Sequence, residues 1–134
     1  MTGKNIKDYL EHSAKFFHLY DSDIEISEDI AGYNYDISEG ISYTLDLTQP
    51  PRSRIKNLTL LSSGEKIRED KFYSVALNSF RGSGGGGYLK AIGLNDPIII
   101  SRSNQEIRNM IIEFLEENPN YKFEINNNWK ILTE

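Results

Sequence analysis

The chain has 134 residues, of which 38% are hydrophobic and 26% charged, as in one globular domain rather than a disordered segment. Its 20 acidic and 15 basic residues give a net charge of −5, which argues against binding to duplex nucleic acid. The lack of cysteine excludes disulfides and thiolate metal sites. We expect neither a membrane span nor a signal peptide, because no apolar run is long enough and the chain opens on a polar segment.

The first 17 residues carry apolar side chains at helical spacing, which predicts an amphipathic helix over residues 4–17. Residues 18–29 are acidic and are expected to form an irregular, solvated loop. Their carboxylates lack the glycine and terminal glutamate of an EF-hand loop, so no calcium site is expected there. These carboxylates belong to Asp21, Asp23, Glu25, Glu28 and Asp29.

The middle of the chain predicts three strands. Apolar and polar residues alternate over residues 41–48, and the prolines at 50–51 end that strand because they cannot donate to a ladder. Residues 55–61 predict the next strand, followed by a turn at 62–65. Residues 71–77 predict a third strand that leads into a glycine-rich loop.

The C-terminal part predicts a short apolar strand over residues 97–101 and then a helix. Ser103 and Glu106 have the spacing of a capping box, and the apolar stripe that follows stops before Pro119. Weak alternation marks the tail from Phe123 to Leu132. The predicted fold class is α+β, with a mixed or antiparallel sheet and flanking helices.

Histidine and cysteine, two common kinds of metal ligand, are sparse or absent in this composition. His12 and His18 are the two histidines, and their spacing puts them about 240° apart around a helix, so they cannot share a metal ion. Arg52 and Arg54 could face an anionic ligand, although arginines at a strand end are more often solvated or paired at the surface. No catalytic or metal-ligating residue is expected in this chain.

The glycine-rich loop is the most informative segment. Five of the ten glycines fall within residues 82–87, between Phe80 and Tyr88. Ordered glycines indicate a backbone that takes positive φ or passes close to another group. The flanking aromatics favour a stacking platform for a nucleobase, worth roughly 1–3 kcal/mol per stack. The alternative is a simple turn between two core aromatics.

Two phosphate-binding motifs do not fit this loop. Gly82, Gly84 and Gly87 match the spacing of a dinucleotide-binding motif, but the chain from Gly87 to Pro97 is too short for the crossover helix. A P-loop is not favoured either, because no Gly-Lys-Ser/Thr follows.

Residues 2–11 resemble the Thr-Gly helix of the 5′-nucleotidase family's C-terminal domain. Other blocks similar to that family follow in its order; they are residues 33–36, 40–43, 46–50, 54–58, 78–88 and 127–129. The closer match is the branch of 2′,3′-cyclic-nucleotide 2′-phosphodiesterase/3′-nucleotidases. Gly86 stands where the ordinary 5′-nucleotidase branch typically has an aspartate.

The resemblance implies a two-domain bacterial hydrolase of nucleotide catabolism, located outside the cytoplasm in the periplasm, secreted or attached to the cell wall. An N-terminal metallophosphatase domain with two divalent metal ions would do the chemistry. The C-terminal domain would hold the base between two aromatic rings. Phe80 matches one ring, whereas the other would precede the Thr-Gly helix.

Residues 1–134 are therefore expected to be a single nucleotide-binding domain, N-terminally truncated and part of a larger enzyme. We expect weak nucleotide binding, no phosphatase activity, and a homodimer through an exposed sheet edge. The expected nucleotide-binding residues are Phe80, Asn78, Arg81, Gly84, Gly85, Gly86 and Tyr88. The alternative function is a stand-alone structural or interaction module.

Overall fold

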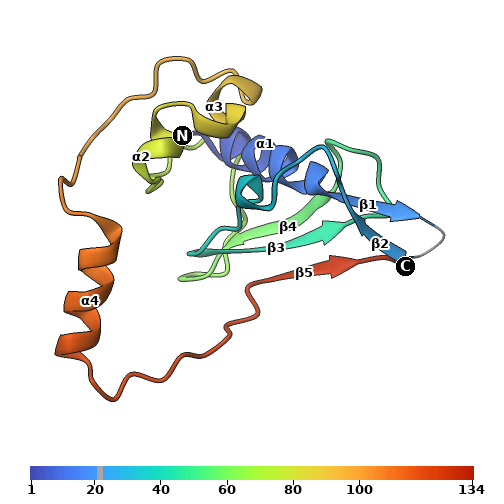
Figure 1. The fold of residues 1–134 in the computed structure, drawn as a ribbon. Helices are drawn as coiled ribbons and strands as arrows, with labels where there is room; N and C mark the ends of the chain where they lie inside the picture. The colour runs from blue at the N-terminus through green and yellow to red at the C-terminus, as the bar shows by residue number, and fades with distance from the viewer. Residues whose placement is uncertain (21–22) are drawn as a thin grey trace. The chain divides into compact units, whose positions relative to one another are not determined.

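The computed structural model describes residues 1–20 and 23–134 (Figure 1). It contains two compact units, Met1–Asp96 with Asn127–Glu134, and Pro97–Asn126. Asp21, one of the carboxylates of the acidic stretch, lies outside the described residues.

The first unit begins with the predicted helix. Helix α1 spans Gly3–Ser13, and Ala14–Phe16 tighten into a 3₁₀ turn. Thr2 caps the helix: its hydroxyl accepts from the Asn5 amide, and the Asn5 side chain accepts from the Thr2 amide. This reciprocal cap satisfies two backbone donors that a helix start leaves unpaired.

The prediction of an irregular loop over residues 18–29 is wrong for part of that stretch. Strands β1 (Phe17–Tyr20) and β2 (Asp23–Ile26) form an antiparallel pair, with Phe17 opposite Ile26. Isoleucines alternate with the acidic residues of β2, a period of two that suits a strand. The acidic side chains of β2 are exposed, so charge and strand pairing do not conflict.

The main sheet has three strands in the order β4-β3-β5 (Figure 1). Strand β3 (Ile41–Asp46) pairs antiparallel with β4 (Ile55–Leu60) and parallel with β5 (Trp129–Leu132). The sheet is thus mixed, as predicted. Its inner face packs on α1, and the buried apolar side chains of this core are Ile6, Leu10, Ala14, Ile41, Tyr43, Leu45, Leu47 and Ile55.

Two predicted strands are absent from the described residues. Residues 71–77 contribute only an isolated bridge between Phe72 and Thr2, and residues 97–101 carry no strand. Sequence alternation shows that a segment can line a sheet, but a strand also needs a neighbour to take its backbone hydrogen bonds. Neither segment belongs to a sheet of the described residues.

Short helices surround the glycine-rich loop. Helix α2 spans Ser79–Gly82 and α3 spans Tyr88–Ala91, with a 3₁₀ turn at Gly85–Gly87 between them. Another 3₁₀ turn lies at Gly32–Asn34. With only four residues, α3 is far shorter than a crossover helix, in agreement with the exclusion of a dinucleotide fold.

The second unit contains helix α4, Ile107–Glu117, which ends before Pro119 as predicted. Its N-cap residue is Glu106 rather than Ser103, so the predicted capping box is wrong. The Ser103 hydroxyl instead accepts from the Gln105 amide in a local turn. Among the described residues, no helix combines the length and apolarity needed to cross a bilayer.

The expectation that the arginines after the proline pair are solvated or paired at the surface is wrong for Arg54. Its guanidinium is buried and donates to the carbonyls of Ala14 at 3.0 Å and Phe17 at 2.7 Å. It therefore ties the end of α1 to the start of β1. Arg52, by contrast, is exposed.

Candidate functional site

The glycine-rich loop packs closely on two of the chain's own side chains. A Cβ added to Gly85 would lie 2.5 Å from ring atoms of Phe80, and one added to Gly86 would overlap the Arg81 guanidinium. Gly86 also has a φ of 70°, in the left-handed region that favours glycine. The sequence predicted a nucleobase against this backbone; in the structure, the groups that lie close to it are the Phe80 ring and the Arg81 guanidinium.

Arg81 is 4% exposed and uses all of its donors within the protein. Its Nε and Nη2 atoms each donate to a carboxylate oxygen of Asp36 at 2.7 Å. The remaining N–H groups donate to Asn34 Oδ1 at 3.1 Å, to the Gly85 carbonyl at 3.2 Å and to the Tyr33 carbonyl at 3.0 Å. A guanidinium has five N–H groups, so none is left for a ligand in this conformation.

Tyr88 lies in a small core beneath the loop and is 1% exposed. Its ring packs on Tyr9 and His12, at centroid distances of 4.3 and 4.6 Å, and carries the Arg81 guanidinium at 4.5 Å. The Tyr88 hydroxyl donates to the Asn34 carbonyl. Burial raises the pKa of Tyr88, so it stays neutral. Tyr88 thus connects this small core to the Arg81 guanidinium, against which the loop packs.

Of the two aromatic residues predicted for the site, Phe80 is the one that is half exposed, at 53%. It sits at the start of α2, where the Asn78 side chain caps the helix by accepting from the Arg81 amide at 2.8 Å. The Arg81 guanidinium lies 5.2 Å from the Phe80 ring centroid. Gly85 and Arg81 therefore support the ring while leaving part of it free.

Asp36 is a residue of this site to which the sequence assigned no role. Besides Arg81, it accepts a hydrogen bond of 2.6 Å from the Tyr9 hydroxyl, and its backbone carbonyl accepts from Ser13 Oγ. Burial alone would raise the pKa of Asp36, but the bonds from Arg81 and Tyr9 hold it below its ordinary value. Asp36 thus joins α1 to the glycine-rich loop.

A cavity of about 600 Å³ lies beside this cluster, within the first unit. Residues 35–41 and 73–78 line it together with the start of α1 and Arg81. Asn78 borders this cavity, so it is both the cap of α2 and a wall of the groove.

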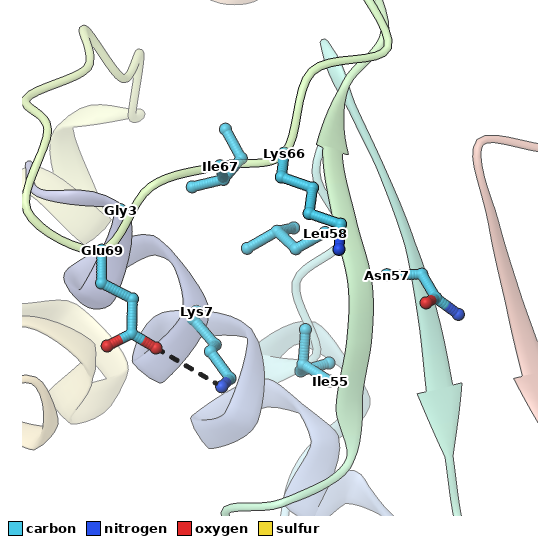
Figure 2. A pocket seen from close by; sticks show the side chains of 8 residues that line it. All are labelled: Gly3, Lys7, Ile55, Asn57, Leu58, Lys66, Ile67 and Glu69. Carbon is cyan, nitrogen blue, oxygen red and sulfur yellow. Dashed lines mark ion pairs between the residues drawn. The ribbon is translucent and has the colours of Figure 1, made fainter.

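A smaller cavity of about 220 Å³ lies between α1, β4 and residues 66–69. Figure 2 shows the side chains that line it. Lys7 and Glu69 line it and form an ion pair with an N–O distance of 3.7 Å. None of the lining residues is aromatic, so this cavity offers no platform for a base. The Phe80 site is therefore the better candidate for a planar ligand.

The described residues do not fit a metal centre. No group of three or more His, Asp or Glu side chains among them is arranged to hold a metal ion. His12 packs on Tyr88 from α1, and His18 belongs to β1, where it pairs with Glu25 in the register. Burial and the nearby Lys15 ammonium lower the pKa of His12, which favours the neutral ring.

Residues 1–92 match the model of the 5′-nucleotidase C-terminal domain, so the chain belongs to that family. A solved 5′-nucleotidase from Staphylococcus aureus, in complex with α-ketoglutarate, superposes with a TM-score of 0.84 at 25% identity and covers 98% of this chain.

Two bacterial proteins that act on nucleotides by name are also similar to this chain. The trifunctional nucleotide phosphoesterase protein YfkN of Bacillus subtilis is 30% identical over 98% of this chain. The 2′,3′-cyclic-nucleotide 2′-phosphodiesterase/3′-nucleotidase of Salmonella typhimurium is 28% identical over 97% of it. The chain spans only 10% and 23% of the lengths of these two relatives.

Proposed function

We propose that this chain is the nucleotide-binding part of a nucleotidase or cyclic phosphodiesterase, with Phe80 as a stacking surface for the base. The observation that carries this proposal is the exposed Phe80 ring, held against the Gly85 backbone by a buried cluster. A ring fixed in this way loses little freedom when a base stacks on it, which favours binding.

The predicted site residues then divide by what they contact. Phe80 would touch the base, and the backbone of Gly84, Gly85 and Gly86 would line the site next to it. Arg81 and Tyr88 would act through the protein, because the Arg81 N–H groups and the Tyr88 hydroxyl already have protein partners. Asn78 would act by capping α2 through its Oδ1 atom.

The proposal extends to the protein that contains this chain. Residues 1–134 would form one domain of a larger enzyme, whose N-terminal metallophosphatase domain holds two divalent metal ions and hydrolyses nucleotide phosphate esters. The names of the relatives support this role. We further propose that the parent protein acts in nucleotide catabolism outside the cytoplasm, and that this chain can form a homodimer through a sheet edge.

Nucleotide titration tests the proposal directly. Calorimetry or NMR titration with adenosine and with 3′-AMP is expected to show weak binding, with shifts at Phe80 and the glycine-rich loop. Phe80→Ala should abolish that response with an unchanged melting temperature, because the ring is half exposed. Phe123→Ala is the matched control, since Phe123 is an exposed phenylalanine of the second unit. An unaltered response of Phe80→Ala would overturn the proposed role of this ring.

One observation favours the alternative of a structural or interaction module. The glycine-rich loop accommodates the chain's own Phe80 and Arg81, so its close approach has an explanation without a ligand. Under this alternative, Phe80→Ala would lower the free energy of unfolding by about 3 kcal/mol or more, as for a core residue. Neither nucleotide would then shift the loop resonances of the unmodified chain.

A further inference from the structure

Asn34 lies against the glycine-rich loop, and its side-chain amide is held in one orientation. Its Oδ1 atom accepts from Arg81 Nη1 at 3.1 Å, and a Cβ added to Gly86 would lie 3.0 Å from the same oxygen. Because a guanidinium only donates, the oxygen of the amide must face Arg81, which leaves the nitrogen on the other side. Arg81 is itself fixed by both carboxylate oxygens of Asp36, so the buried cluster sets this orientation.

The Nδ2 group of Asn34 is an unused hydrogen-bond donor. The backbone N–H of Asn34 donates to the Ala31 carbonyl at 2.8 Å, and its backbone carbonyl accepts from the Tyr88 hydroxyl. Among the described residues, nothing accepts from Nδ2. This nitrogen is not buried, because the one buried side-chain atom without a partner in the described part of the chain is Glu11 Oε2. Two oriented N–H groups therefore reach solvent beside the loop.

This donor and the Phe80 ring lie against neighbouring residues of the loop. The ring lies against Gly85 and the Asn34 amide against Gly86, and the Cα atoms of consecutive residues are about 3.8 Å apart. The Arg81 guanidinium joins the two groups, since its Cζ atom is 5.2 Å from the Phe80 ring centroid. A base that stacks on Phe80 would thus carry its attached sugar toward Asn34, one residue further along the loop.

We propose that Asn34 is a further binding residue of this site, whose Nδ2 group donates a hydrogen bond to a hydroxyl oxygen of the ribose. This role rests on the proposed function, because it requires a base stacked on Phe80. The amide is uncharged, and the charge of the neighbouring guanidinium is balanced by Asp36. A neutral hydroxyl oxygen suits such a donor better than a phosphate, which is bound most strongly by charged groups. Asn34 would make the site prefer nucleosides to free bases.

NMR titration of the ¹⁵N-labelled full chain tests this contact. Adenine, 2′,3′-dideoxyadenosine and adenosine form a series in which only adenosine carries the sugar hydroxyls. All are expected to shift the loop resonances, because each can stack on Phe80. Only adenosine should shift the Asn34 Nδ2 resonance, and it should bind about three- to tenfold more tightly than the other two, as expected for one net hydrogen bond.

Asn34→Asp is the variant that isolates the donor. It keeps a side-chain oxygen for Arg81 Nη1 but has no N–H group to offer. This variant should bind adenosine as weakly as adenine, with its affinity for adenine unchanged. Asn109→Asp is the matched control, since it adds the same charge at an exposed position of α4, and it should leave all affinities unaltered.

Three results would overturn this role of Asn34 while the loop still responds to the ligands, as the proposed function requires. The first is an Asn34 Nδ2 resonance that adenosine does not move. The second is an equal shift of that resonance by adenine, which would assign the donor to the base. The third is an equal loss of adenine and adenosine binding in Asn34→Asp, which would mean that the residue acts through the fold of the loop. If no ligand shifts the loop, the proposed function fails together with this role.

Discussion

Helices α1 and α4 have the same length, 11 residues, and the same kind of apolar stripe, yet their environments differ. Helix α1 buries Ile6, Tyr9 and Leu10 against the sheet and the small core under the glycine-rich loop. Helix α4 has no buried residue, and Ile107 and Ile111 of its stripe are exposed. Periodicity therefore predicts that a helix forms, but the stability of that helix comes from what covers its stripe.

The largest expected difference between the two helices is at matched leucines. Leu10→Ala should lower the free energy of unfolding of the first unit by about 3 kcal/mol, because it leaves a cavity in the core. Leu115→Ala should change it by less than about 0.5 kcal/mol. Urea denaturation followed by tryptophan fluorescence measures both, since Trp129 belongs to β5 in the first unit. Equal effects would mean that the α4 stripe is covered in solution.

Ion pairs provide the next comparison. Asp36→Ala should destabilise the first unit by about 2–3 kcal/mol, because it leaves the buried Arg81 guanidinium without its carboxylate. The pair of Glu106 and Arg108 in the second unit is exposed, so Glu106→Ala should have an effect near zero. The same denaturation experiment compares the two variants. A loss below about 1 kcal/mol for Asp36→Ala would show that water readily replaces the carboxylate.

A smaller effect is expected at the glycine-rich loop. Gly86→Ala should cost about 1–2 kcal/mol, because the new methyl group meets the Arg81 guanidinium and the backbone has a positive φ. Gly32→Ala is the control, since nothing lies within 4 Å of a Cβ there. The melting temperature from circular dichroism distinguishes them. If Gly86→Ala melts with the parent chain, the contact between Arg81 and the loop is looser than described.

The smallest effect concerns pH and His12. Because the folded-state pKa of His12 is lowered from 6.5, its contribution to stability is complete above pH 6.5 and is lost as the pH falls through and below that value. We expect a loss below about 1 kcal/mol, since solvent screens this partly exposed ring. His12→Gln should flatten the pH dependence of stability between pH 7 and 5, with His18→Gln as the control. A slope that persists in His12→Gln would assign it to another group.

The sequence predicted most of the elements that are defined by residues close together in the chain. The helix from Gly3, strands β3 and β4, and the end of α4 before Pro119 follow from periodicity and proline chemistry. Residues 71–77 have an equally good strand pattern, but a strand is completed by a neighbour that no local pattern reveals. Sequence patterning also missed the β1–β2 pair, because acidic side chains hid its alternation.

The candidate site was predictable in part. The glycines correctly indicated a backbone with positive φ that passes close to other groups, but the sequence suggested a ligand there, whereas the groups in contact are Phe80 and Arg81 of the chain itself. The sequence assigned no role to Asp36, because its partner Arg81 lies 45 positions further along the chain and no local pattern links the two residues. Whether Phe80 and its neighbours bind a nucleotide stays a prediction.

The saturated guanidinium of Arg81 has a consequence for recognition by the proposed site. Its positive charge is balanced by Asp36, and every N–H is occupied, so it offers no counter-charge to a phosphate. A base stacked on Phe80 would then be held by its aromatic surface alone. Adenosine and 3′-AMP would bind this chain with similar affinity and with little dependence on salt, leaving the phosphate free to be bound by a different part of the proposed parent enzyme.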